Sequence, residues 1–123
     1  DHIEVHVKNA EKYSIFLTKL MGAGRYKKIS ENNTYMFVSA DEMHIEIKQK
    51  KEYERNFDVQ NDVGFCLPCL RMKGAKQHLA TLSDIEIVNT LQNPDGDVIF
   101  FKDYEGIIWH FKDYDLLDEY VNI

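Results

Sequence analysis

One order of strands and helix occurs twice along this sequence, and this repetition constrains the fold more than any other feature. Residues 2–8 alternate polar and apolar side chains, as a strand does, and residues 9–22 change to the spacing of an amphipathic helix. Asn9 is suited to cap that helix and Gly22 to end it. Three strand-like runs follow, separated by short turns: 25–30, 34–40 and 43–49. The first part of the chain therefore reads strand, helix, strand, strand, strand.

The second part of the chain shows the same order. After a charged connector, 51–61, the pattern predicts a strand over 62–67 and a helix over 71–82. Three more strand-like runs follow: 85–91, 97–104 and 106–114. We therefore predict a single domain of 123 residues. It consists of module 1 (1–50), the connector, module 2 (62–114) and a short C-terminal tail (115–123).

The first and last strands of each module carry chelating or charged side chains on one face. Successive side chains of a strand point to opposite faces. The apolar side chains of these strands share one face, which we expect to pack on the helix of the module. The opposite faces hold His2, Glu4 and His6; His44, Glu46 and Lys48; Asp62, Gly64 and Cys66; and Ile108, His110 and Lys112. This pattern predicts a polar cavity to which all four strands contribute.

Charge and hydropathy exclude several classes of partner. The formal net charge is −6, and the lysines are interspersed with acidic residues, which argues against nucleic acid and anionic membranes. No apolar run approaches the ~20 residues needed to span a bilayer, and the first residues lack the layout of a signal peptide. We expect a soluble cytoplasmic protein that binds a small molecule or another protein.

The two cysteines of the chain, Cys66 and Cys69, form a C-x-x-C pattern that is typical of redox and zinc sites. A redox pair of this kind opens a helix, whereas the surrounding residues here have the pattern of a strand. A structural zinc site needs a second pair, which the sequence lacks. We interpret both residues as ordinary reduced thiols of a cytosolic protein.

A duplicated βαβββ module with these residues resembles the vicinal oxygen chelate superfamily, which includes glyoxalase I, bleomycin-resistance proteins, extradiol dioxygenases and fosfomycin-resistance enzymes. Residues 2–22 are similar to the opening pattern of the family, and residues 97–111 to its closing pattern. The resemblance covers essentially the whole chain. It implies an α+β fold in which two βαβββ modules form a curled mixed sheet around a central cavity, and it implies a homodimer.

In the metal-dependent members, the first and last strand of each module each supply one metal ligand. The matching positions in this chain are His2, Glu46, Asp62 and His110, where the usual order is His, Glu, His, Glu. Two imidazoles and two carboxylates suit a divalent ion such as Mn²⁺, Fe²⁺, Ni²⁺ or Zn²⁺. The resemblance therefore implies a glyoxalase-like lyase or isomerase that acts on a small molecule with vicinal oxygens.

The resemblance also implies roles for the other polar side chains. Glu46 would serve both as a metal ligand and as the catalytic base. Four cationic or titratable side chains share the polar faces and are candidates to bind an acidic group of the substrate: His6, His44, Lys48 and Lys112. For each one taken singly, a solvated residue at the rim of a cavity is an equally good interpretation.

Four alternatives stay open at the level of the sequence. A dioxygenase would hold Fe²⁺ with His2, His110 and Glu46, and a thiol transferase would resemble the fosfomycin-resistance enzymes. A metal-free binding protein of the bleomycin-resistance type would instead use aromatic side chains to hold a ligand. A module whose ancestral site has lapsed would act as a scaffold or regulator. The first observation that separates these classes is whether a metal co-purifies with the protein.

Overall fold

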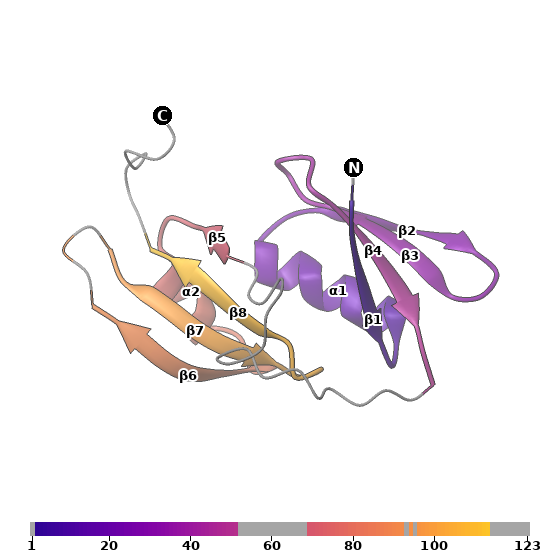
Figure 1. Cartoon of the computed structure of the whole chain (residues 1–123). Helices are drawn as coiled ribbons and strands as arrows, with labels where there is room; N and C mark the ends of the chain where they lie inside the picture. Colours follow the sequence, from indigo (N-terminus) through magenta and orange to yellow (C-terminus); the bar gives the residue numbers. More distant parts are fainter. Residues whose placement is uncertain (1, 52–68, 93, 95, 114–123) are drawn as a thin grey trace. The chain divides into compact units, whose positions relative to one another are not determined.

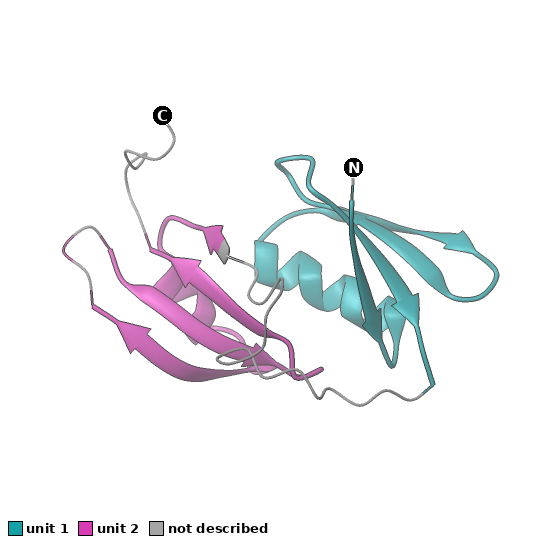
Figure 2. Cartoon of the chain, in the orientation of Figure 1, with its two compact units in different colours: residues 1–55 teal, residues 56–123 magenta. Residues whose placement is uncertain are grey.

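The structure, a computed structural model, describes residues 2–51, 69–92, 94 and 96–113 of the chain (Figure 1). The chain divides into two compact units, Asp1–Arg55 and Asn56–Ile123, with the boundary inside the predicted connector (Figure 2). Within these described residues, each unit contains one strand, one helix and three further strands in chain order. The predicted α+β fold of two βαβββ modules is therefore confirmed.

The first unit is a mixed four-stranded sheet with one helix. Its elements are β1 (Ile3–Val7), α1 (Ala10–Met21), β2 (Arg25–Ser30), β3 (Thr34–Val38) and β4 (His44–Gln49). The order in the sheet is β1-β4-β3-β2, with β1 parallel to β4 and the other pairs antiparallel. The helix therefore connects an edge strand, β1, to the opposite edge strand, β2.

Both predicted ends of α1 are confirmed. The side chain of Asn9 accepts a hydrogen bond from the backbone N–H of Lys12 at 2.9 Å, and Gly22 adopts the left-handed conformation (φ 74°) that ends helices. Between these ends, α1 buries one stripe of side chains and packs it on β3 and β4. The buried side chains that form this core include Tyr13, Leu17, Leu20, Phe37 and Ile47.

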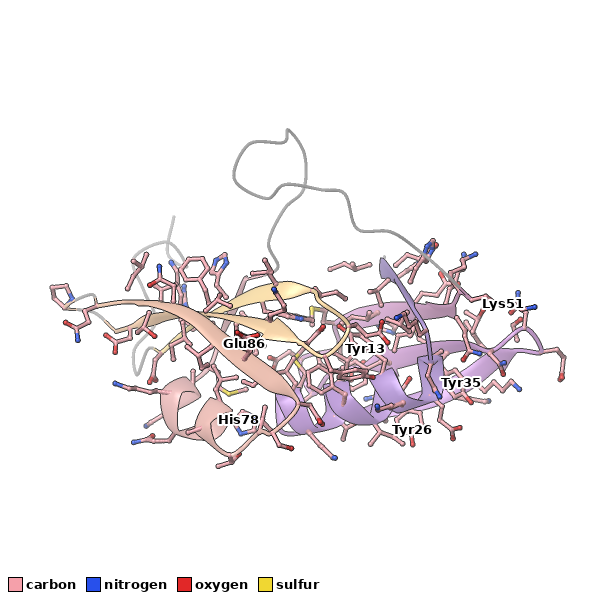
Figure 3. All side chains as sticks on the ribbon, turned by 90° about the horizontal axis from the view of Figure 1, so that it is seen from below. Tyr13, Tyr26, Tyr35, Lys51, His78 and Glu86 are labelled. Carbon is pink, nitrogen blue, oxygen red and sulfur yellow. The ribbon has the colours of Figure 1, made fainter. Side chains whose placement is uncertain are left out.

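Two tyrosines that are labelled in Figure 3 lie on neighbouring strands of this sheet. Tyr35 of β3 is 9% exposed and Tyr26 of the edge strand β2 is 39% exposed, with their ring centroids 6.3 Å apart. Burial raises the pKa of the Tyr35 phenol above its ordinary value of 10.0, and the negative charge of Glu11 acts in the same direction.

The second unit repeats this topology. Its elements are β5 (Cys69–Arg71), α2 (Ala75–Ala80), β6 (Ile85–Leu91), β7 (Val98–Asp103) and β8 (Ile108–Lys112). The order in the sheet is β5-β8-β7-β6, with β5 parallel to β8. The predicted strand 62–67 lies outside the described residues. None of the helices in the described parts of the chain has the length and apolar character to cross a membrane.

The helix of the second unit is shorter than the predicted 71–82. Arg71 is the last residue of β5, and Gly74 at the N-cap has φ 71°, a left-handed conformation that cannot continue a helix. The carboxylate of Asp113 accepts hydrogen bonds from the backbone N–H groups of Gly74 at 2.9 Å and Lys76 at 3.3 Å. The predicted start of this helix at residue 71 was therefore wrong.

The duplication extends to individual hydrogen bonds. In the turn before β4, the backbone N–H of Ser39 donates to Met43 O, and in the turn before β8 that of Asp103 donates to Ile107 O. The side chain of Gln49, the last residue of β4, accepts a hydrogen bond from the backbone N–H of Ala10, the first residue of α1. The side chain of Asp113, directly after β8, likewise accepts one from the backbone N–H of Gly74. Each residue in these bonds of the first unit is separated from its counterpart in the second unit by the same number of sequence positions. Glu46 and His110 are separated by that number of positions as well.

Candidate metal centre

The paired strands β1 and β4 present charged side chains on one face of the first sheet. The pairing places Glu4 opposite Glu46 and His6 opposite Lys48. On β4, Ile45 and Ile47 are buried on the core side, whereas Glu46 and Lys48 are half-buried on the other side. The alternation predicted for β4 is therefore confirmed.

The apolar side of β1 is less buried than predicted. Val7 is fully buried, but Ile3 is 45% exposed. Because β1 is an edge strand of the sheet, its first residues have a neighbouring strand on one side only. The polar side chains of β1 lie correspondingly near solvent.

Five side chains form an alternating series of bases and acids, which we call the β1–β4 polar face. His2 Nε2 lies 2.9 Å from Glu46 Oε2, and His6 Nε2 lies 2.6 Å from Glu4 Oε1. Between the two carboxylates, Lys48 Nζ lies 3.0 Å from Glu4 Oε2 and 3.8 Å from Glu46 Oε1. Hydrogen bonds from His6 and Lys48 lower the pKa of Glu4, and the bond to Glu4 raises the pKa of Lys48.

The structure brings together two of the four predicted metal ligands, His2 and Glu46. It also brings a third donor, Glu4, close to them. The sequence predicted Glu4 on this face but not as a ligand. One ligand atom from each of His2, Glu4 and Glu46 lies within 4.8 Å of the others. The signal that points to Glu4 is its register opposite Glu46, which depends on the parallel pairing of β1 with β4.

Asp62, a predicted ligand, lies outside the described residues, and His110 lies on β8 in the second unit. On β8, Trp109 and Phe111 are buried in the core while His110 and Lys112 are half-buried on the other side, so the predicted alternation is confirmed here as well. His110 thus occupies the same position on its strand as Glu46 does on β4.

The imidazole of His110 packs against an aromatic ring. Its ring lies 5.1 Å from that of Phe100, its partner on β7. Its buried Nδ1 atom has no hydrogen-bond partner among the described residues. Burial lowers the pKa of His110, and the nearby charge of Lys112 lowers it further. The imidazole is therefore neutral at neutral pH, which is the form that binds metals.

The predicted substrate-binding residues are divided between the two units. Lys48 and His6 belong to the β1–β4 polar face. His44 begins β4, and its Nδ1 lies 2.9 Å from the backbone oxygen of Glu42, where it donates a hydrogen bond. Lys112 shares its side of β8 with His110. Cys69, one of the two cysteines, pairs with His110 through the parallel β5–β8 register.

No family model and no curated protein matches this chain. Solved structures do match it. A glyoxalase/dioxygenase from Nostoc punctiforme gives a TM-score of 0.71 at 11% identity, with 94% of this chain and 90% of that chain covered. A glyoxylase/bleomycin resistance protein/dioxygenase domain from a Frankia species gives 0.69 at 13% identity, with 93% and 95% covered.

The fosfomycin resistance protein FosX from Listeria monocytogenes also matches, with a TM-score of 0.68 at 17% identity and coverage of 100% of this chain and 96% of that chain. Another structure of FosX, a variant in complex with Mn(II) and a dihydroxypropylphosphonic acid, gives 0.66 at 16% identity, with 94% and 89% covered. The chain therefore has the fold that these glyoxalase/dioxygenase and fosfomycin-resistance structures share, as its sequence predicted.

Proposed function

We propose that this chain is a glyoxalase-like metalloenzyme in which His2, Glu46, Asp62 and His110 hold a divalent ion. The observation that carries the proposal is the His2–Glu46 pair, 2.9 Å apart, at two of the four positions where the resemblance implies ligands. The equivalent strand position of His110 and its lowered pKa support it further, because a neutral imidazole is a competent ligand. The donor set suits Mn²⁺, Fe²⁺, Ni²⁺ or Zn²⁺.

The proposed substrate is a small molecule with two neighbouring oxygens and an acidic group. A bound ion supplies Lewis-acid stabilisation of negative charge on those oxygens. Glu46 accepts a proton from the substrate, and His2 orients its carboxylate through the contact at Oε2. Lys48, the ammonium nearest to Glu46 on the β1–β4 polar face, binds the acidic group together with His6, His44 and Lys112.

A metal-free binding protein of the bleomycin-resistance type is the second candidate. Lys48 favours it, because its ammonium already lies between the carboxylates of Glu4 and Glu46 and balances part of their charge without a metal ion. Such a protein would bind an organic ligand without any dependence on divalent ions. The metal analysis described next distinguishes the two candidates.

The test is elemental analysis of untagged protein purified without chelator and then reconstituted with each candidate ion. We expect about one equivalent of metal per chain. His2→Ala and His110→Ala should each lose it while retaining the far-UV circular dichroism of the wild type. Glu86→Gln on β6 removes an exposed carboxylate from another part of the chain and should leave the stoichiometry unchanged. A wild-type protein that takes up no metal under any of these conditions would refute the proposal of a metalloenzyme.

We also propose that the protein is a cytoplasmic homodimer, which is the assembly that the family resemblance implies. Light scattering coupled to size-exclusion chromatography would give the mass in solution, to be compared with the chain mass of 14.5 kDa. A mass equal to one chain across the accessible concentration range would refute the dimer.

A further inference from the structure

Glu4 is a charged residue on the β1–β4 polar face that the proposed ligand set does not use. It lies directly opposite Glu46 across the parallel strand pair. Like charges directly opposite one another on neighbouring strands repel and destabilise a sheet. In this chain, the repulsion is balanced by Lys48, which contacts both carboxylates, and by His2 and His6, which each contact one.

The donor atoms of this cluster are spaced for a single small cation. Ligands at about 2.1 Å from a common metal ion lie at most about 4.2 Å from one another. The atoms offered by His2, Glu4 and Glu46 all lie within 4.8 Å of one another, so small side-chain rotations would bring them into that range. The side chains of His2 and Glu4 are 36% and 39% exposed, so such rotations meet little packing resistance.

We propose that Glu4 is a third metal ligand of the first unit, and that a divalent ion bound by His2, Glu4 and Glu46 displaces Lys48 from both carboxylates. This inference rests on the proposed function for His2 and Glu46, but it needs no residue of the second unit. An ammonium group has no lone pair to donate, so Lys48 and the metal ion compete for the same oxygens. One imidazole and two carboxylates make an oxygen-rich set, which favours Mn²⁺.

Calorimetric titration of the full chain with Mn²⁺ tests the assignment. Glu4→Gln removes the charge, whereas Glu4→Asp keeps the charge and withdraws the carboxylate by one methylene. Both variants should bind Mn²⁺ about 10-fold or more weakly than the wild type, because loss of an outer partner alone costs that much. Lys48→Met should bind Mn²⁺ more tightly, because the competing ammonium is gone.

The variants separate direct ligation from the general electrostatic field. If Glu4 acts only through its charge, Glu4→Asp will bind Mn²⁺ as the wild type does, and this result would overturn the inference. Glu86→Gln removes the same charge from β6 and should leave Mn²⁺ affinity unchanged. Wild-type protein that binds no Mn²⁺ would also overturn it.

His110→Ala separates this inference from the proposed function. Loss of Mn²⁺ affinity in both Glu4 variants but not in His110→Ala would support a site confined to the first unit and would refute the four-residue site. Loss in His110→Ala with wild-type affinity in Glu4→Asp would support the four-residue site and refute Glu4 as a ligand. Far-UV circular dichroism of each variant confirms that the comparison is made on folded protein.

Discussion

Replacing Asp103 with alanine should destabilise the second unit and the strand that carries His110. Asp103 ends β7 and is 3% exposed. Its Oδ1 accepts hydrogen bonds from the backbone N–H groups of Glu105 at 2.9 Å and Ile107 at 3.0 Å. Its Oδ2 accepts one from Trp109 Nε1 at 3.1 Å. These bonds fix the turn that sets the start of β8, and alanine removes both acceptor oxygens and with them all three bonds.

The expected loss in the free energy of unfolding follows from the three hydrogen-bond donors that are left without an acceptor. The indole N–H of Trp109 is left without its acceptor in a buried environment, which costs about 2 kcal/mol. The backbone donors of Glu105 and Ile107 are half-buried and regain water more easily, so we assign about 1 kcal/mol to each. The sum of about 4 kcal/mol is a large part of the 5–15 kcal/mol that roughly stabilises a typical domain.

The assay is urea unfolding followed by tryptophan fluorescence. Trp109 is the one tryptophan of the sequence, so its emission reports on the second unit. With a slope of about 1.5 kcal/mol per molar urea, the midpoint should fall by roughly 2–3 M. Asp103→Asn keeps one acceptor oxygen and should therefore lose about half as much stability as Asp103→Ala.

A matched control comes from the equivalent turn of the first unit. Ser39 Oγ accepts a hydrogen bond from the backbone N–H of Met43 at 3.0 Å, so Ser39→Ala should cost only about 1 kcal/mol, measured by far-UV circular dichroism because Trp109 reports on the second unit. A loss below about 1 kcal/mol for Asp103→Ala would refute the reasoning, because a buried donor without an acceptor must cost at least that much. Equal losses for the Asn and Ala variants would refute it as well.

Two further predictions concern the first unit. Gly24→Ala should lower the thermal midpoint by more than about 5 °C in a calorimetric scan. The reason is that Gly24 has φ +138° and that a Cβ there would lie 2.6 Å from the Cζ atom of the buried Phe37. A midpoint within 2 °C of the wild type would contradict this prediction, because even roughly 1 kcal/mol of destabilisation lowers the midpoint by more than that. The raised pKa of Tyr35 contributes stability that is present below pH 10 and is lost as the pH rises toward the folded-state pKa. Tyr35→Phe should remove one phenol with a raised pKa from an ultraviolet titration and flatten the alkaline loss of stability, and unchanged curves would contradict the assignment.

The parts of the fold that the sequence predicted are those governed by local patterns. Alternation along β4 and β8 predicted which side chains are buried, because period two in a strand leaves one side for the core. The ends of α1 were predicted because Asn9 and Gly22 each act within one turn of the helix. The start of α2 was not predicted, since the decisive partner of Gly74 is Asp113, distant in sequence and close in space.

The candidate site was predictable to the same extent. Alternation predicted the polar faces of β4 and β8, which include Glu46 and His110. The assignment of His2, Glu46 and His110 as ligands came from the family resemblance and stays a prediction. The role of Glu4 depends on the register of two strands that are separated by the whole module, and alternation along one strand carries no information about register. The same holds for Lys48, whose contact with Glu4 crosses between the strands.

Equivalent positions in the two modules now carry chemically opposite side chains. Glu46 on β4 is a carboxylate in contact with His2 and Lys48, whereas His110 on β8 is a neutral imidazole against Phe100. The described residues of the first module therefore supply negative charge to the proposed metal centre, whereas His110 of the second module supplies a nitrogen that adds no charge. Because Asp62 takes the place of a His and His110 the place of a Glu, the proposed ligand set keeps two imidazoles and two carboxylates, and the formal charge that the ligands supply to a bound ion is unchanged.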